Sequence, residues 1–427
     1  MTLHYFNPWH DEALAARDAH CQPPLAARRL AADLACLPLW WAQPGDLVVA
    51  WDTPSADNGG TGRLTEITGR LTENPNRLTG KTVSPPARHG RQGVWAPRPM
   101  VGRVGLTGDG LPALSDLTPL DGSADAVRAL RGVGRVDPWG WDAHTASQLR
   151  AWGVAHGLLP SSARLDTLRS LSSRHTAVGL LRALRDAGPA YAGDALWCTS
   201  EAEVSRAVEA LPRTMLKAPW SGSGRGLRRG FGRYEPPLDG WVRRVLSRQG
   251  AVVVEPFFDR LADMAFEYEL HPGGRVEFLG GSFFTTDATG RYTGSLVAPP
   301  DVLLAHMGRA VGTAVVERAA ADVGTLLPAA LPGYAGPVGV DLMAVDGRDG
   351  RPALHPCVEV NVRRTMGRVA LDLLRWVAPG RQARLTLRRP GQPAPEPETD
   401  GGRLVRGSLP LTPAQAGTGV QAWLEIP

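Results

Sequence analysis

One stretch constrains the fold of this chain more than any other, because it joins a strand that ends in lysine to a second strand through a loop of alternating glycines. The stretch covers 216–227 and reads LKAPWSGSGRGL. Gly222, Gly224 and Gly226 leave backbone N–H groups free to face one anion, with no bulky side chain in the way. Lys217 adds a compact positive charge nearby. We therefore expect a phosphate-binding β-hairpin, with a flexible hairpin loop as the alternative.

Lysine is rare in this chain, which sharpens the interpretation of Lys217. The chain has 47 basic residues, and all of them except Lys81 and Lys217 are arginines. An ammonium group on a flexible stem and a planar guanidinium group bind anions with different geometry. In a chain that otherwise uses arginine, a lysine suggests a role that arginine does not fill.

Two later stretches each place one acid inside an apolar run. The first is 336–343, GPVGVDLM, with Asp341, and the second is 355–364, HPCVEVNVRR, with Glu359. Burial of a carboxylate without a partner is costly. Side chains at i and i+2 of a strand share a face, so Glu359 and Asn361 project the same way. Two carboxylates and an amide oxygen suit Mg²⁺ or Mn²⁺ held jointly with phosphates; a structural network of acids and arginines is the alternative.

A further apolar run, 251–257, has the composition of a buried strand and carries Glu255 near its end. Main-chain groups near Phe257 could reach the edge of a purine, and Asp263 follows as an acid suited to ribose hydroxyls. By itself, the pattern is more often that of a core strand that leads into a turn.

Composition limits the class of protein. A chain of 427 residues is too long for one compact core and indicates several subdomains. No apolar run approaches the roughly 20 residues of a membrane span, and the first residues lack the pattern of a signal peptide, so we expect a cytoplasmic protein. The net charge of +5 is spread among acids, which argues against a nucleic-acid partner. The cysteines are scattered and are expected to be buried thiols.

Hydrophobic periodicity and turn residues predict the order of the elements. We expect a strand, a helix and a strand over 1–54, an irregular insertion over 55–98, and short strands with a helix up to 137. Further helices are expected at 143–156, 174–187, 200–210, 238–248, 301–326 and 365–378. Further strands are expected at 213–217, 227–231, 251–257, 264–270, 275–285, 291–297, 337–345 and 353–360. The Pro-rich tail 389–427 is expected to be loose, apart from a terminal strand at 420–426 that docks back.

In this order and spacing, the elements resemble the ATP-grasp superfamily over about 140–380. The lysine before SGSGRG, the Asp of GVD and the Glu-x-Asn pair carry the resemblance. The stretches FNPWHD at 6–11 and PWGWD at 138–142 are similar to an ATP-grasp subgroup that has an N-terminal pre-ATP-grasp domain.

The resemblance implies an α/β (α+β) fold with three parts. A small α/β pre-ATP-grasp domain would cover 1–137, and the ATP-grasp domain would cover 138–388. Its two α+β lobes would sandwich ATP, and the lid lobe would span about 190–255. The tail 389–427 would follow.

The resemblance also implies a role for each candidate residue. Lys217 would contact the ATP phosphates, and so would the loop residues Ser221, Gly222, Ser223, Gly224 and Gly226. Arg174 stands where the family often has a second phosphate-binding lysine, at the start of a helix. Glu255 and the backbone of Phe257 would hold adenine, and Asp263 would hold the ribose. Asp341, Glu359 and Asn361 would bind one or two Mg²⁺ (or Mn²⁺), and Arg363 or Arg364 would bind the substrate carboxylate or the transferred phosphoryl group.

The implied activity is an ADP-forming, ATP-dependent ligase that joins a small-molecule carboxylate to an amine through an acylphosphate. The substrates would include amino acids or peptides, and the family allows a homodimer. A kinase that phosphorylates without ligation and a non-catalytic nucleotide-binding module remain open. Two further pairs are ambiguous: His10 and Asp11 face the substrate or start a helix, and Glu267 and Glu269 form an acid–base pair or, as we favour, a solvated strand face.

Overall fold

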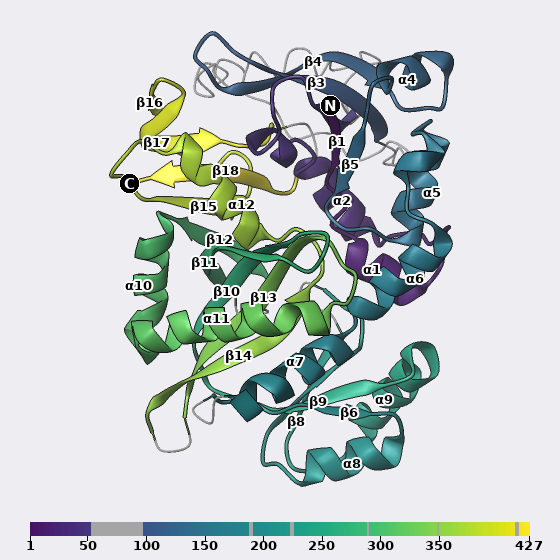
Figure 1. The fold of residues 1–427 in the computed structure, drawn as a ribbon, viewed down its shortest axis with the longest axis vertical. Coiled ribbons are helices and arrows are strands. Elements are labelled where there is room, and N and C mark those ends of the chain that lie inside the picture. Colours follow the sequence, from purple (N-terminus) through teal and green to yellow (C-terminus); the bar gives the residue numbers. More distant parts are fainter. Residues whose placement is uncertain (53–96, 188–190, 223–225, 288–289, 348–349, 415–417) are drawn as a thin grey trace, which may run out of the picture.

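The computed structural model describes residues 1–52, 97–187, 191–222, 226–287, 290–347, 350–414 and 418–427. These residues form three sheets, with helices packed against each of them (Figure 1). The mixed helix and strand content confirms the predicted α/β class. Most of the insertion predicted at 55–98 lies outside the described residues, and so do Ser223 and Gly224 of the glycine-rich loop.

The N-terminal part is a five-stranded sheet in the order β4-β3-β2-β1-β5. Strand β1 pairs in parallel with β2 and β5, whereas β3 and β4 continue the sheet antiparallel. Its strands are β1 (Thr2–Tyr5), β2 (Leu47–Asp52), β3 (Arg98–Leu106), β4 (Pro112–Pro119) and β5 (Arg135–Pro138). Its helices are α1 (His10–Ala16), α2 (Leu25–Asp33), η1 (Leu37–Trp40), α4 (Ala124–Ala129) and α5 (Ala143–Ala151). The strand, helix and strand predicted for 1–54 are thus confirmed.

A small second lobe contains the predicted lysine strand. Its four strands follow the order β6-β9-β7-β8, all antiparallel, and two helices pack on them around a separate apolar core. The strands are β6 (Leu196–Cys198), β7 (Thr214–Lys217), β8 (Leu227–Gly230) and β9 (Val252–Pro256). The helices are α8 (Glu201–Glu209) and α9 (Pro236–Gln249). The lobe lies within about 190–255, the range for which the sequence predicted a lid lobe, and its role as a lid stays a prediction.

The largest sheet has nine strands in the order β14-β13-β10-β11-β12-β15-β18-β17-β16. Its first five strands are β10 (Arg260–Leu270), β11 (Val276–Thr286), β12 (Tyr292–Val297), β13 (Gly336–Asp346) and β14 (Pro352–Asn361). The helices of this region are η3 (His156–Leu158), α6 (Ser162–Leu171), α7 (Arg174–Ala187), α10 (Pro300–Val311), α11 (Thr313–Ala330), α12 (Met366–Leu373) and η4 (Leu374–Trp376).

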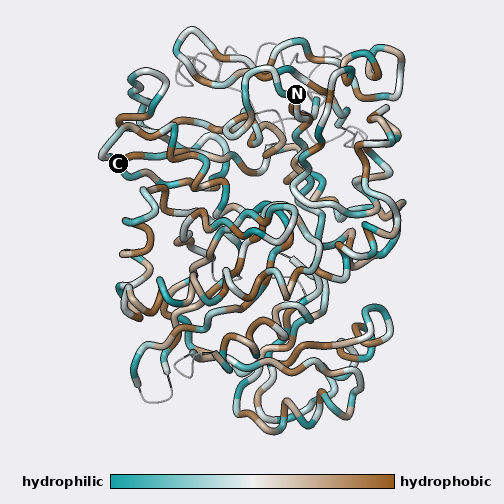
Figure 2. The backbone as a smooth tube through the Cα atoms, in the orientation of Figure 1, coloured by the Kyte–Doolittle hydropathy of each residue, from teal (hydrophilic) through white to brown (hydrophobic). Residues whose placement is uncertain are grey.

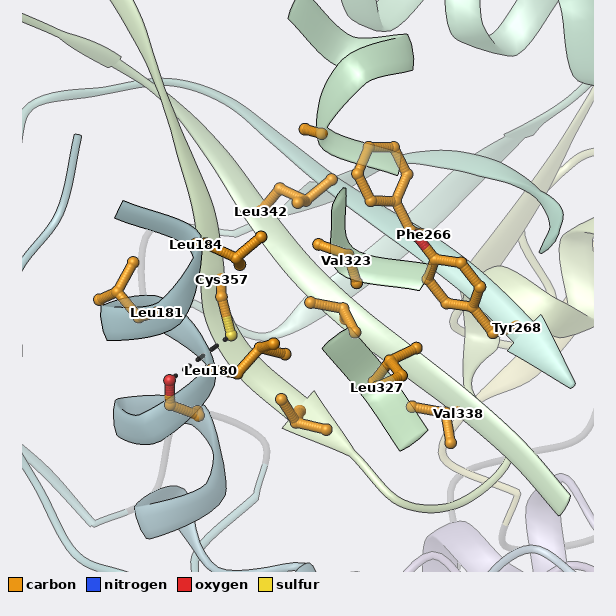
Figure 3. Close-up of a cluster of buried hydrophobic side chains, with 14 of the residues drawn as sticks. Leu180, Leu181, Leu184, Phe266, Tyr268, Val323, Leu327, Val338, Leu342 and Cys357 are labelled. Atoms are coloured by element: carbon orange, nitrogen blue, oxygen red, sulfur yellow. Dashed lines mark hydrogen bonds between the residues drawn. The ribbon is translucent and has the colours of Figure 1, made fainter. Parts of the chain in front are cut away.

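The main core lies between this sheet and the helices α7 and α11. Figure 3 shows Leu180 and Leu184 of α7 together with Val323 and Leu327 of α11 in one buried cluster against the strands. Phe266 and Tyr268 of β10 belong to the same buried cluster (Figure 3). Along the backbone, hydrophobic colour concentrates in interior strands and helices, and hydrophilic colour in outer loops (Figure 2). One face of β10, β13 and β14 is therefore committed to the core, and their other face is free for a site.

The C-terminal tail differs from the expectation of a loose segment. Strands β15 (Ala383–Arg388), β16 (Glu398–Asp400), β17 (Arg403–Pro410) and β18 (Gln421–Ile426) extend the large sheet from β12. The terminal strand was predicted, but β17 was not, although it pairs with β18 and buries Leu404 and Leu409. The prolines at 390–397 lie between β15 and β16 and interrupt no strand, so the Pro-rich composition alone misled the prediction.

Two helix predictions also need correction. The long helix expected at 301–326 is divided at Gly312, whose φ of 92° ends α10 and begins α11. A left-handed conformation is readily adopted by glycine, which lacks a Cβ. Helix α6 was not predicted; Ser161 caps it by accepting from the Arg164 amide. Within the described ranges, we find no helix with the length and apolarity to cross a membrane.

Candidate functional site

The register of the large sheet brings the two late acids together. Asp341 of β13 lies directly opposite Glu359 of β14, and Gly339 lies opposite Asn361. Because alternate side chains share a face, Asp341, Glu359 and Asn361 lie on the side of the sheet away from the core, where they are buried or half-buried. The predicted oxygen ligands thus come from paired positions on adjacent strands.

The glycine-rich hairpin begins where β7 ends. Lys217 is the last residue of β7, and the loop closes with a hydrogen bond from the Ala218 amide to the Gly226 carbonyl, 3.0 Å long. Gly226 has a φ of 73°, and a Cβ at this position would come within 2.7 Å of the Ser221 Cβ. The described part of the loop therefore needs glycine at 226, both for its backbone conformation and for its close packing.

Arg174 connects the loop to the acidic strands. It is the first residue of α7 and is only 6% exposed. Its guanidinium donates to the Ala218 carbonyl at 2.5 Å, and to the Ser221 hydroxyl and carbonyl at 2.7 and 2.9 Å. A further N–H donates to Glu359 Oε1 at 2.9 Å. One buried side chain thus holds the hairpin and a predicted metal ligand next to each other.

Arg363 and Arg364 point to different places. Arg363 forms an ion pair with Asp11 of helix α1, with Nη2 3.0 Å from the carboxylate. Arg364 instead pairs with Asp372 at 2.7 Å and Asp137 at 3.4 Å, and its guanidinium stacks on the ring of Trp41. Of the two predicted substrate-binding arginines, Arg363 lies among the other candidate residues, and Arg364 lies in a network with the N-terminal part.

Asp11 was ambiguous in the sequence, and the structure gives it a defined position. Besides Arg363, its carboxylate lies against the backbone of Gly222, where any Cβ would overlap it. Burial alone would raise the pKa of Asp11, but Arg363 and, to a smaller extent, His10 and Arg174 hold that pKa below its usual value. Asp11 is therefore an anion that joins the N-terminal part to the glycine-rich loop.

The metal-ligand candidates are in an electrostatically unfavourable position. Loss of solvent and, next, the neighbouring Glu359 carboxylate raise the pKa of Asp341 to about 7, against the opposing effects of Arg363 and Asn361. Two carboxylates on facing strands repel each other unless a cation or proton lies between them. Oxygen donors in this arrangement fit Mg²⁺ or Mn²⁺. No group of three or more His, Cys, Asp or Glu side chains in the described part of the chain could hold a metal ion, so a cation here would depend on these two acids, the amide and phosphate oxygens.

Glu267 is a residue whose environment the sequence did not reveal. It lies on β10 beside Gly339, is 1% exposed, and accepts a 2.7 Å hydrogen bond from the Thr365 hydroxyl. Burial, with a smaller contribution from Asp341, raises its pKa to about 8, although the hydrogen bond from Thr365 acts in the opposite direction. The expectation that Glu267 and Glu269 form a solvated face is therefore wrong for Glu267. No local pattern indicates this burial, because it depends on the register in which β10 pairs with β13.

The residues assigned to adenine and ribose have their own partners. Glu255 forms a buried ion pair with Lys217 of 2.7 Å, and Lys217 also donates to the Val358 carbonyl at 3.3 Å. The Phe257 amide donates to the Arg213 carbonyl at 3.0 Å. Asp263 accepts from Arg260 and from the Thr286 hydroxyl at 2.6 and 3.1 Å. Their nucleotide-binding roles stay predictions.

A small cavity lies where these elements meet, with about 10 Å³ of free space. It joins the α1 segment, the hairpin and strand β14 with the residues after it. Its lining residues are His10, Asp11, Ser172, Pro219, Trp220, Ser221, Glu359, Val360, Asn361, Val362 and Arg363. Six sequence positions of predicted or ambiguous role therefore converge on one space.

Comparison with known proteins gives likeness at the level of the fold. No protein-family model and no curated protein matches the chain. Among solved structures, it is similar to N5-carboxyaminoimidazole ribonucleotide synthetase from Thermus thermophilus, at 15% identity and a TM-score of 0.43, over 71% of this chain and 79% of that one. It is also similar to the ADP complex of N5-carboxyaminoimidazole synthetase from Staphylococcus aureus, at 10% identity and a TM-score of 0.41, over 70% of this chain and 78% of that one.

Biotin carboxylase from Campylobacter jejuni, as a complex with β,γ-ATP, gives 13% identity, a TM-score of 0.42, and coverage of 70% and 72%. At such identities and scores, the likeness carries no argument about activity, which has to come from the site itself. The fold is α/β, with two α+β lobes on either side of the site, as the resemblance to the ATP-grasp superfamily predicts.

Proposed function

We propose that this chain is an ATP-dependent ligase of the ATP-grasp type, which activates a carboxylate as an acylphosphate and transfers the acyl group to an amine. The observation that carries the proposal is the position of Arg174, which is hydrogen-bonded to the hairpin at Ser221 and to Glu359 at once. A phosphate cradle and a metal site must be adjacent for phosphoryl transfer, because the same phosphate oxygens contact both.

Each candidate residue has a task in this reaction. Lys217 and the amides of the loop Ser221–Gly226 would bind the β- and γ-phosphates, with Arg174 adding a forked donor. Asp341, Glu359 and Asn361 would hold Mg²⁺ or Mn²⁺, which neutralises charge on the transferred phosphoryl group. Glu255, the backbone near Phe257 and Asp263 would hold the adenosine part. Arg363 would bind the carboxylate substrate.

The charges of the site support this assignment. Removal of solvent and the neighbouring Glu359 raise the pKa of Asp341 to about 7, so the ionised pair is costly in the absence of a cation. Positioning and charge neutralisation supply most of the catalysis in phosphoryl transfer. Cations, paired oxygen ligands and a closable loop are the groups such a reaction needs.

Binding of a nucleotide would rearrange the ion pairs of the site. Arg174 and Arg363 already pair with Glu359 and Asp11. We infer that the phosphates would displace these carboxylates from the arginines. The lid would then close over the acylphosphate and keep water away from it.

The test is a set of three assays on the purified chain with pooled carboxylates. Release of ADP should require Mg²⁺ or Mn²⁺ and a carboxylate. Hydroxylamine should trap the acylphosphate as a hydroxamate, and an amine should yield an amide and phosphate. ADP release with a stable phosphorylated product and no amide would indicate a kinase. Absence of nucleotide binding and turnover under all conditions would contradict the proposal.

A further inference from the structure

A buried histidine–aspartate pair lies at the edge of the candidate site. His10 is the first residue of α1 and Asp142 is the N-cap of α5, and they are 2% and 1% exposed. His10 Nδ1 is 3.2 Å from Asp142 Oδ2. A carboxylate at this nitrogen favours the tautomer with the proton on Nδ1, because an ionised carboxylate only accepts hydrogen bonds.

The pair is held in place by its surroundings. Asn7 donates to Asp142 Oδ2 at 3.2 Å, to the Thr145 hydroxyl at 2.9 Å and to the Gly140 carbonyl at 2.9 Å. The Asp142 carboxylate also accepts from the amide and hydroxyl of Thr145, at 2.8 and 2.9 Å. Gly140 packs against the imidazole so closely that a Cβ would lie 2.6 Å from His10 Cγ. The ring therefore has a fixed orientation.

The other ring nitrogen has no hydrogen-bond partner among the residues that the structure describes. His10 Nε2 is buried and makes no hydrogen bond in the described part of the protein. Buried polar atoms are nearly always paired, so an exception calls for a ligand or a catalytic use. His10 lines the cavity that also contains Ser221, Glu359, Asn361 and Arg363.

We propose that His10 is the general base for the amine substrate and that Asp142 is the residue that positions it. This inference rests on the ligase function proposed above and adds to it the residue that prepares the nucleophile. A neutral imidazole with its lone pair on Nε2 can accept one proton from the ammonium form of the amine. Asp142 then stabilises the imidazolium through Nδ1.

The step balances as follows. His10 Nε2 takes one proton from R–NH₃⁺, and the freed nitrogen lone pair forms a bond to the acyl carbon of the acylphosphate. The bond from that carbon to the phosphate oxygen breaks, and the phosphate leaves with its electron pair. The second N–H proton goes to the departing phosphate, so the products are the amide and hydrogen phosphate. The imidazolium returns its proton to solvent.

The charges around His10 fit a transient cation. Asp142 of α5 and Asp11 of its own helix are its acidic neighbours, and Glu359 of β14 lines the same cavity. Arg363 and Arg174 lie beyond Asp11 and interact with it. These carboxylates lie where they would offset the positive charge that the ring carries during the step.

The experiment compares two nucleophiles in the same enzyme. Hydroxylamine is largely neutral at pH 7 and needs no general base, whereas an alkylamine is protonated. His10→Gln and Asp142→Asn should keep wild-type hydroxamate formation and lower amide formation by about 10²-fold or more. With the alkylamine, the variant rate should keep rising with pH up to the pKa of the amine, because only the free amine can then attack. His144→Gln, in the same domain, is the matched control and should leave both reactions unchanged.

The outcomes separate this inference from the ligase proposal. Equal loss of hydroxamate and amide in His10→Gln, with an unchanged melting temperature, would show that His10 does not act on the amine. The same conclusion would follow if Asp142→Asn ligated amines at the wild-type rate with an unchanged pH profile. If His10→Gln fails to fold, Asp142→Asn decides the matter by the same two assays. If the wild type formed neither product, the ligase function itself would fail.

Discussion

Arg174 and Glu359 lie 185 positions apart in the sequence and form an ion pair of 2.9 Å in the candidate site. The same guanidinium binds Ser221. Arg174 thus occupies the position where loop, metal ligands and phosphates would meet. The geometry of a fork with several N–H donors, and not charge alone, explains how one side chain reaches both partners.

The first prediction concerns that fork. Arg174→Lys keeps the charge but offers one ammonium in place of a planar donor set, so it cannot hold Ser221 and Glu359 together. We expect the KM for ATP to rise about tenfold in Arg174→Lys, and to rise further in Arg174→Ala. Steady-state kinetics measures this, and Arg182→Lys on the same helix is the control. An unchanged KM in Arg174→Lys would mean that the fork plays no part in nucleotide binding.

The second prediction separates structure from catalysis at Lys217. Lys217→Met leaves Glu255 buried without its partner, which should cost about 3–5 kcal/mol of unfolding free energy. The double variant Lys217→Met/Glu255→Gln should regain most of that stability, because no charge remains unpaired. Its ATP turnover should stay below 1/100 of wild type, roughly, because the phosphate contact is absent. Chemical denaturation measures the unfolding free energy, and an ADP assay measures the turnover. Wild-type turnover in the double variant would show that Lys217 takes no part in the reaction.

The third prediction concerns the contact between the loop and the N-terminal part. A Cβ at Gly222 would overlap the Asp11 carboxylate, so Gly222→Ala should displace the loop and lower turnover by about tenfold or more. Asp11→Ala should partly rescue Gly222→Ala, giving a non-additive double-mutant cycle. Gly105→Ala, where no atom lies within 4 Å of the added Cβ, is the control. Strict additivity would show that the two residues do not interact.

The fourth prediction is a dependence of stability on pH. The pKa of Asp341 is raised from 3.8 to about 7, and that of Glu267 to about 8. A carboxyl with a higher pKa in the folded state binds its proton more tightly there, so its contribution is full at low pH and is lost as the pH rises through the folded value. In EDTA, the unfolding free energy should therefore fall between pH 5 and pH 8.

Mg²⁺ should oppose that fall, because it binds the ionised carboxylates. Denaturant unfolding at several pH values, with EDTA or Mg²⁺, measures both effects. In Asp341→Asn, the fall with pH should be smaller and the effect of Mg²⁺ should disappear. Equal stabilisation of wild type and Asp341→Asn by Mg²⁺ would place the ion elsewhere.

The sequence predicted most of the elements that form the site. Helix 174–187 was predicted with its bounds, and the strands at 213–217, 337–345 and 353–360 were predicted to within a few residues. These elements have strong apolar periodicity, so local pattern and tertiary packing agree. The pairing of Asp341 with Glu359 could not be predicted, because register depends on long-range contacts.

The misses have physical causes as well. The break at Gly312 depends on local backbone conformation, and the tail strand β17 depends on its pairing with β18. Glu267 was predicted to be solvated because its neighbours in sequence are polar on one face, yet Thr365 and the sheet bury it. The contact between His10 and Asp142 depends on the packing of α1 against α5, and no local sequence pattern predicts that packing.

The most direct test of the central claim is calorimetric titration of ATP into the wild type and into the double variant Asp341→Asn/Glu359→Gln, each with Mg²⁺ and with EDTA. The account predicts that the wild type binds ATP at least about tenfold more tightly with Mg²⁺ than with EDTA, and that the double variant shows no such difference. Equal affinity of the wild type in both buffers, or a full Mg²⁺ effect in the double variant, would contradict a nucleotide–metal site on these strands.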